Sequence, residues 1–196
     1  MSESEIAGSD IYMKPKVVFE RGKKYMVCAQ SGHGKSSLLN FIYGSNLCFD
    51  GKIMYHDIVS DPFLFRRDKL SYVFQDLCLF NELTALENVQ LKNNLTHYKS
   101  DHEIITMLER LLPSEKKNQP VGTLSLGQRQ RVAVVRALCQ PFEFLMLDEP
   151  FSHIDHSNAM MVAELITEEV NRQGAGLIVT ALDAIDLFDF DTTLNL

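Results

Sequence analysis

The segment Ala29-Gln30-Ser31-Gly32-His33-Gly34-Lys35-Ser36 follows one short apolar run and opens a helical pattern. We expect a strand over 25–29 before it and a helix over 35–43 after it, ended by Gly44. Glycines at such a turn let the backbone curl so that successive N–H groups point at phosphate oxygens. The helix N-terminus adds the positive end of its dipole. The segment therefore predicts a phosphate-binding loop in an α/β protein.

We expect this loop to bind a nucleotide and Mg²⁺. Lys35 would place a positive charge on the β- and γ-phosphates, and Ser36 would offer its hydroxyl to Mg²⁺. His33 either approaches the nucleotide or points outward, and Ala29 replaces the first glycine of the usual pattern. The predicted nucleotide-binding residues of the loop are Ser31, Gly32, His33, Gly34, Lys35, Ser36 and Ser37.

A second motif, Phe144-Leu145-Met146-Leu147-Asp148-Glu149-Pro150, joins an apolar run to two carboxylates. Four consecutive apolar residues are typical of a central parallel strand that is buried on both faces. Ligands bind at the carboxyl edge of such sheets, where the two acids would lie. We expect Asp148 to bind Mg²⁺ through water and Glu149 to act as the general base on the attacking water.

The remaining periodicity predicts strands alternating with helices, and hence a largely parallel sheet. In the helix at 158–172, Met161, Leu165 and Ile166 are expected to face inward, with Gly174 at the C-terminal end. Residues 1–15 are expected to be weakly ordered. The other predicted strands are 17–19, 70–74 and 177–180, and helical patterns cover 84–118 and 128–139.

The composition is that of an ordinary globular chain. Its 196 residues, 45% of them hydrophobic, are enough for one domain with a substantial core. A net charge of −7 argues against nucleic acid as a partner. No apolar run approaches the roughly 18–20 residues that cross a bilayer, and the acidic start at 1–5 does not read as a signal peptide. Four widely spaced cysteines favour reduced thiols in the cytosol.

Further motifs carry a resemblance to a known family. Leu124-Ser125-Leu126-Gly127-Gln128 lies about twenty residues before the acidic motif, and Tyr72-Val73-Phe74-Gln75 and Ser152-His153-Ile154-Asp155 flank the pair. With the phosphate loop, these segments resemble the signature, Q-loop and D-loop of an ABC transporter nucleotide-binding subunit. The segment 83–89, Leu-Thr-Ala-Leu-Glu-Asn-Val, is similar to the lipoprotein-releasing and macrolide-exporting branch, or is simply a capped amphipathic helix.

The resemblance implies a P-loop NTPase core of ABC type over residues 16–196, with a small helical subdomain at about 78–130. It implies a head-to-tail dimer in which Ser125, Gly127 and Gln128 of one copy cover ATP bound at Lys35 of the other. Gln75 would contact Mg²⁺ and the attacking water. The chain would be an ATPase subunit on the inner face of the cytoplasmic membrane, docked near 76–82 on a separate permease, with Leu79 and Phe80 as apolar anchors.

The sequence departs from the family pattern at three positions. Ala181 stands where the family places a histidine that contacts the γ-phosphate, so the resemblance implies slow hydrolysis. Leu126 replaces a signature glycine, a change that we expect to be tolerated. Tyr12 is a candidate for stacking on adenine, or is simply a tyrosine of the N-terminal tail.

Two functions follow from these features. One is a transporter ATPase subunit, which the intact Glu149 favours. The other is an ATP-gated module that dimerises with little or no hydrolysis, which Ala181 favours. A chromosome-structuring ATPase head would need a long coiled-coil insertion, and the segment between Gln75 and Leu124 is too short to contain one.

Overall fold

The computed structural model describes residues 8–55 and 62–196 of the chain. Its centre is a five-stranded sheet in the order β2-β3-β4-β1-β5, in which every neighbouring pair is parallel. The sheet therefore delivers the carboxyl ends of all its strands to one edge. The strands are β1 (Lys24–Cys28), β2 (Leu70–Val73), β3 (Phe144–Asp148), β4 (Gly176–Ala181) and β5 (Thr192–Asn195).

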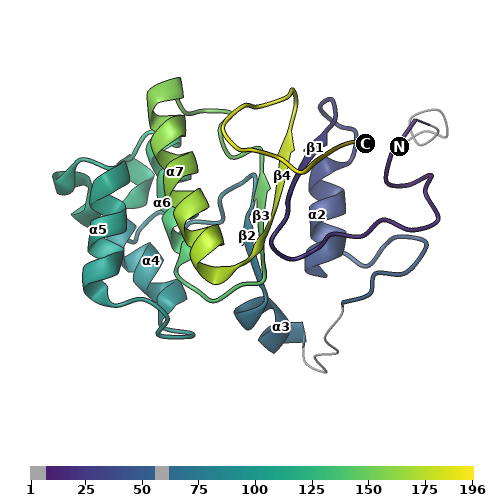
Figure 1. Cartoon of the computed structure of the whole chain (residues 1–196). Coiled ribbons are helices and arrows are strands. Elements are labelled where there is room, and N and C mark those ends of the chain that lie inside the picture. The colour runs from purple at the N-terminus through teal and green to yellow at the C-terminus, as the bar shows by residue number, and fades with distance from the viewer. Residues whose placement is uncertain (1–7, 56–61) are drawn as a thin grey trace.

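Helices cover both faces of this sheet (Figure 1). Helices α6 and α7 lie on one face, and α2 lies on the other. Helices α4 and α5 pack beside α6 and α7, away from the sheet. The helices are α2 (Lys35–Tyr43), α3 (Pro62–Asp68), α4 (Ala85–Asn93), α5 (Asp101–Leu111), α6 (Leu126–Leu138) and α7 (His156–Gln173), with 3₁₀ turns η1 (Ser114–Asn118) and η2 (Val121–Thr123).

The alternation of side chains along the central strands divides the core in two. Leu145 and Leu147 of β3 pack in the larger cluster, with α6 and α7, whereas Met146 between them packs in the smaller cluster, with Leu38 and Leu39 of α2. Successive strand residues point to opposite faces, so an uninterrupted apolar run is needed to fill both layers. The predicted burial of β3 on both faces is confirmed.

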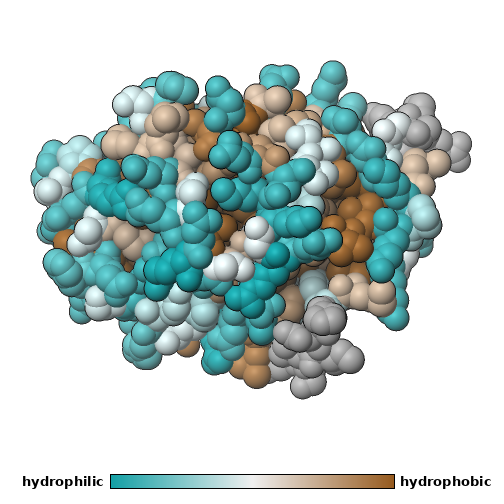
Figure 2. Space-filling model, in the orientation of Figure 1, coloured by the Kyte–Doolittle hydropathy of each residue, from teal (hydrophilic) through white to brown (hydrophobic). Residues whose placement is uncertain are grey.

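The outer face of α7 is polar, as its amphipathic pattern requires. Figure 2 shows mostly hydrophilic side chains on this side of the molecule, with hydrophobic ones between them. The buried stripe of α7 includes Val162, Leu165 and Ile166. Met161 was predicted to face inward, and this prediction is wrong, since 39% of its surface is exposed. The stripe is centred on Val162 and Ile166, and one residue along a helix turns the side chain by about 100°.

Two boundaries differ from the sequence prediction. The prediction of a strand at 17–19 is wrong, because residues 16–20 do not pair with the sheet. This segment is held instead by Tyr25, whose hydroxyl accepts a hydrogen bond from Glu20 N at 2.8 Å and whose ring meets Phe19 edge-on. Helix α6 begins at Leu126 and not at 128, because Ser125 caps it.

Part of the segment expected to be weakly ordered is hydrogen-bonded to β5. Asp10 N donates to Asn195 O at 2.8 Å, and Asn195 N donates to Asp10 Oδ2 at 3.0 Å. Ser9 is buried, and its hydroxyl accepts hydrogen bonds from Ile11 N at 3.1 Å and Tyr12 N at 3.0 Å. Residues 9–12 are therefore anchored by hydrogen bonds, and residues 1–7 lie outside the described part. The division into a domain at 16–196 with a helical subdomain at about 78–130 stays a prediction.

The helical part is built from well-capped helices. Thr84 and Glu87 form a capping box at α4, and Ser100 and Glu103 form another at α5. Each box satisfies backbone groups that the first turn of a helix leaves free. The segment 83–89 thus includes a capped helix. None of the described helices is long and apolar enough to span a bilayer.

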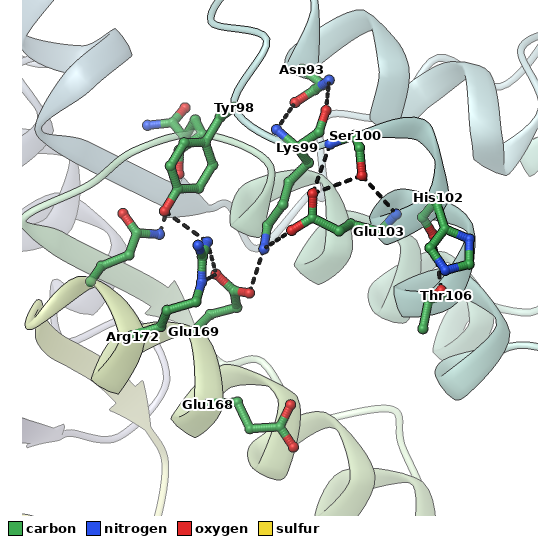
Figure 3. A network of polar contacts seen from close by, with 12 residues as sticks. Asn93, Tyr98, Lys99, Ser100, His102, Glu103, Thr106, Glu168, Glu169 and Arg172 are labelled. Carbon is green, nitrogen blue, oxygen red and sulfur yellow. Dashed lines mark hydrogen bonds and ion pairs between the residues drawn. The ribbon is translucent and has the colours of Figure 1, made fainter.

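A buried ionic network joins this helical part to α7 (Figure 3). Lys99 Nζ lies 2.6 Å from Glu169 Oε1 and 3.4 Å from Glu103 Oε1, and Lys99 and Glu169 are both buried. Arg172 also binds Glu169, at 2.8 Å, and donates to the Tyr98 hydroxyl at 2.7 Å. Asn93 fixes the backbone of Lys99 through two hydrogen bonds of 2.9 Å.

We predict that Glu169→Leu lowers the free energy of unfolding by about 3 kcal/mol, because it leaves the buried Lys99 ammonium with only the exposed Glu103 carboxylate at 3.4 Å. The matched control is Glu168→Leu, one position earlier on α7, which removes a surface pair with Arg110. That change is expected to cost about 1 kcal/mol or less. Guanidinium denaturation measures both values, and equal losses would contradict the prediction.

Candidate nucleotide site

The phosphate loop lies between β1 and α2, as predicted. Gly32 and Gly34 have φ of 82° and 86°, which a residue with a side chain rarely adopts. Lys35 is 5% exposed, and its Nζ donates to Ala29 O at 2.7 Å and Gln30 O at 3.0 Å. The loop is thus curled around its own lysine, and its N–H groups stand at the start of a helix, where anions are favoured.

The carboxylate of Asp148 is oriented by two hydroxyl groups. Thr180 Oγ1 donates to Asp148 Oδ1 at 2.7 Å, and the Tyr72 hydroxyl lies 3.4 Å from Asp148 Oδ2. Burial, followed by the Asp148 carboxylate, raises the pKa of Tyr72, which keeps its phenol protonated. Asp148 is 2% exposed. Strands β2, β3 and β4 each supply one member of this group, so only the sheet brings them together.

Glu149 stands on a strained backbone next to the loop lysine. Its φ of 48° is left-handed, which is unusual for a residue with a side chain. Its Oε1 lies 3.1 Å from Lys35 Nζ. Its N–H points at Thr180, and its carbonyl accepts bonds from Gln130 Nε2 at 3.0 Å and Ser152 Oγ at 3.1 Å. Strain held in this way by several neighbours is typical of functional sites.

Gln75 meets the phosphate loop directly. Its Oε1 accepts a hydrogen bond from Ser36 Oγ at 3.1 Å, although 39 positions separate the two residues. Ser36, Gln75 and Asp148 offer hydroxyl, amide and carboxylate oxygens, which are the ligands that Mg²⁺ prefers. The donor set thus fits the metal that the sequence predicts.

The signature residues form the start of α6. Ser125 and Gln128 cap each other: Gln128 N donates to Ser125 Oγ at 3.3 Å, and Ser125 N donates to Gln128 Oε1 at 3.0 Å. Gly127 lies so close to the loop after Glu149 that a Cβ there would be 2.6 Å from His153 O. No side chain fits without a shift, so this glycine is required by packing.

Ala181 ends β4 beside the phosphate loop. It pairs with Cys28 of β1, and its carbonyl accepts a hydrogen bond from Ala29 N at 3.2 Å. A side chain at this position therefore starts next to the residues that lead into the loop.

Several residues at the site escaped the sequence analysis. Tyr72 was named only within a predicted strand and the Gln75 motif, Thr180 only as a strand residue, and Gln130 only as part of a helix. Their polar groups are buried, and a polar residue inside an apolar strand or helix stripe is the signal that could have singled them out.

Comparison with known proteins identifies the family. A model of the ABC transporter family matches residues 13–152. The chain is 33% identical over 183 residues to the lipoprotein-releasing system ATP-binding protein LolD of Treponema denticola, covering 88% of this chain and 80% of the relative. It is 32% identical to the glucose import ATP-binding protein GlcV of Saccharolobus solfataricus, covering 92% of this chain and 56% of the relative.

Solved structures agree with this relationship. The dimeric structure of MJ0796, a bacterial ABC transporter cassette, matches with a TM-score of 0.77 and 27% identity, covering 85% of this chain and 78% of the other. A post-hydrolysis dimer of the same cassette bound to ADP and phosphate matches with a TM-score of 0.71.

The protein therefore belongs to the ABC transporter family, as an ATP-binding subunit. The predicted fold, a P-loop NTPase core of ABC type, is confirmed. The resemblance to the lipoprotein-releasing branch is also confirmed, since LolD of Buchnera aphidicola, at 27% identity, is a second relative of that kind. These relatives do not favour the alternative of an ATP-gated module with little hydrolysis.

Proposed function

We propose that this chain hydrolyses ATP as one half of a head-to-tail dimer and thereby drives a separate membrane permease. The observation that carries the proposal is the meeting of separate motifs at one sheet edge. Lys35 lies 3.1 Å from Glu149, and Ser36 lies 3.1 Å from Gln75. One nucleotide at this edge would touch residues from the ends of β1, β2 and β3.

Each residue has a distinct task in this proposal. Ser31 to Ser37 bind the phosphates, with Lys35 opposing the charge on the β- and γ-groups. Ser36, Gln75 and, through water, Asp148 would hold Mg²⁺, which would supply positive charge to the β- and γ-phosphates. Glu149 takes the proton of the attacking water, and Gln75 orients that water. Thr180 and Tyr72 keep the Asp148 carboxylate in its orientation.

The second copy completes the site. We propose that Ser125, Gly127 and Gln128 of one protomer cover the ATP bound by its partner. The exposed start of α6 offers backbone N–H groups and the positive end of the helix dipole to the γ-phosphate. The dimeric cassette to which the chain is similar supports this arrangement.

Glu149→Gln tests the function. Removing the base leaves binding intact while hydrolysis stalls, so we expect a stable dimer in Mg-ATP by light scattering. Lys35→Ala is the matched control, because it removes the other member of the 3.1 Å pair. It is expected to bind Mg-ATP at least tenfold more weakly, about 1.4 kcal/mol, and to stay monomeric. A Glu149→Gln chain that remains monomeric at high concentration would contradict the proposal.

Ala181 sets the rate in this proposal. Loss of a donor to a developing anion costs on the order of 10²–10³ in rate, and alanine offers no donor. We expect Ala181→His to raise kcat tenfold or more in a steady-state ATPase assay. Leu182→His, at the exposed neighbouring position, is the control and is expected to leave kcat unchanged. Brisk hydrolysis by the wild type, with no gain from Ala181→His, would show that another residue has this role.

We place the permease at the segment 76–82, on the cytoplasmic face of the membrane. Phe80 is 53% exposed and lines a cavity of about 270 Å³ with Phe74, Leu91, Lys92 and Arg136 among its walls. Burial lowers the pKa of Lys92 and of Arg136. An apolar rim over two cations suits a short permease segment that presents an apolar side chain beside a carboxylate.

Phe80→Asp is expected to abolish co-purification of the permease from detergent-solubilised membranes, because it places a charge on the apolar anchor. ATP binding is expected to stay within twofold of the wild type. Leu47→Asp, 77% exposed and outside this cavity, is the control. The docking site would be wrong if both variants retained the permease equally.

A further inference from the structure

The loop that follows Gln75 contains two strained residues in succession. Leu77 and Cys78 have φ of 63° and 48°, in the left-handed region. For residues with a Cβ this conformation is sterically unfavourable. Neither residue is a glycine or an asparagine, so contacts from elsewhere must hold the turn. The turn begins two positions after the amide that meets Ser36.

Arg136 of α6 supplies those contacts. Its Nη2 donates to Leu77 O at 2.6 Å, and its Nη1 donates to Cys78 O at 2.6 Å. The planar guanidinium thus bridges the carbonyls of both strained residues, a geometry that a lysine ammonium does not reproduce. Burial lowers the pKa of Arg136.

The rest of the loop is held independently. Asn88 of α4 is buried, and its side chain binds Phe80 N at 2.9 Å and the carbonyls of Phe80 and Thr84 at 3.0 Å each. Without the Arg136 contacts, the part of the loop nearest Gln75 would keep the 2.9 Å bond from Leu77 N to Phe74 O and the buried Leu77 side chain, but no other described residue would bind the carbonyls of its two strained residues. A cavity of about 360 Å³ has Gln75, Leu77 and Cys78 in its walls and leaves this part of the loop room to move.

We infer that Arg136 is a positioning residue for ATP hydrolysis: by bridging Leu77 and Cys78 it fixes the loop that presents Gln75 to Ser36. The inference rests on the proposed function, which gives Gln75 its task on the metal and the water. It adds a residue that touches neither. Helix α6 begins at the signature segment, where Ser125 caps it. The same helix therefore carries the signature at one end and holds the loop after Gln75 at the other.

Arg136→Lys keeps the charge and loses the bridge. We expect kcat to fall at least tenfold while the Kd for ATP stays within twofold, because Gln75 is misplaced and the phosphate loop is intact. Adding Cys78→Gly to Arg136→Lys is expected to raise kcat at least threefold above that of Arg136→Lys alone, because glycine adopts positive φ without the steric cost. A role of Arg136 in general stability would not be rescued by a glycine in this loop.

Arg21→Lys is the matched control. Arg21 also bridges two consecutive carbonyls, those of Gln173 and Gly174 at 2.9 Å each, at the C-terminal end of α7. That end is far along the chain from the loop at 75–78 and forms no part of the nucleotide site. We expect Arg21→Lys to leave kcat unchanged.

The Cys78 thiol gives a readout that needs no hydrolysis. Cys78 is exposed, but partial burial of its thiol and a hydrogen bond to Asp76 raise its pKa to about 11, and a higher pKa leaves less of the reactive thiolate at neutral pH. In a Cys48→Ser background, which removes the other exposed thiol, we expect Arg136→Lys to speed labelling of Cys78 at least fivefold. Arg21→Lys is expected to leave the labelling rate unchanged.

Unchanged kcat, or unchanged labelling, in Arg136→Lys would overturn the inference. So would failure of Cys78→Gly to restore any activity. A wild-type chain that binds ATP and never hydrolyses it would instead refute the proposed function, and the labelling rates would then decide alone whether Arg136 holds the loop.

Discussion

The parallel direction of the five strands is the constraint on which the site depends. It sends the carboxyl ends of β1, β2, β3 and β4 to one edge, so the phosphate loop, Gln75, Asp148 and Ala181 arise there together. A parallel sheet must be covered on both faces. The alternation along β3 provides this, with Met146 against α2 and its neighbours against α6 and α7. The parallel direction of the strands thus requires their burial on both faces and also places the site at one edge of the sheet.

The edge also stores backbone strain. Glu149, Leu77 and Cys78 all have left-handed φ values, and residues in such regions cost about 1–3 kcal/mol each. The compensation comes from polar side chains of neighbouring elements. Gln130 of α6 binds the Glu149 carbonyl, and Arg136 of the same helix binds the two loop carbonyls. These three residues stand in the segments that the proposed mechanism uses, whereas His97, with φ of 49°, lies in the loop before α5.

Helix α6 connects the parts of the molecule that sequence comparison treats as separate motifs. Its start carries the signature segment, its close approach to the His153 carbonyl requires Gly127, and its later turns reach the Glu149 carbonyl and the loop after Gln75. A displacement of this helix would therefore reach several motifs at once. The buried ion pair of Lys99 and Glu169 restrains the surroundings of this helix, because it joins the segment before α5 to α7.

The sequence alone determined the class of fold and most of its elements, because local signals suffice for them. The helix at 35–43 and the glycine after it were predicted as observed, and so was the strand that leads to Asp148. Features that depend on contacts between distant segments could not be predicted from the sequence. Two examples are the pairing of 17–19 with the sheet, which does not occur, and the orientation of Met161, which is exposed. Only the tertiary structure could bring Tyr72 and Thr180 to Asp148, or Arg136 to Leu77. Those contacts depend on strand register and helix packing, and a sequence periodicity of 2 or 3.6 residues carries neither.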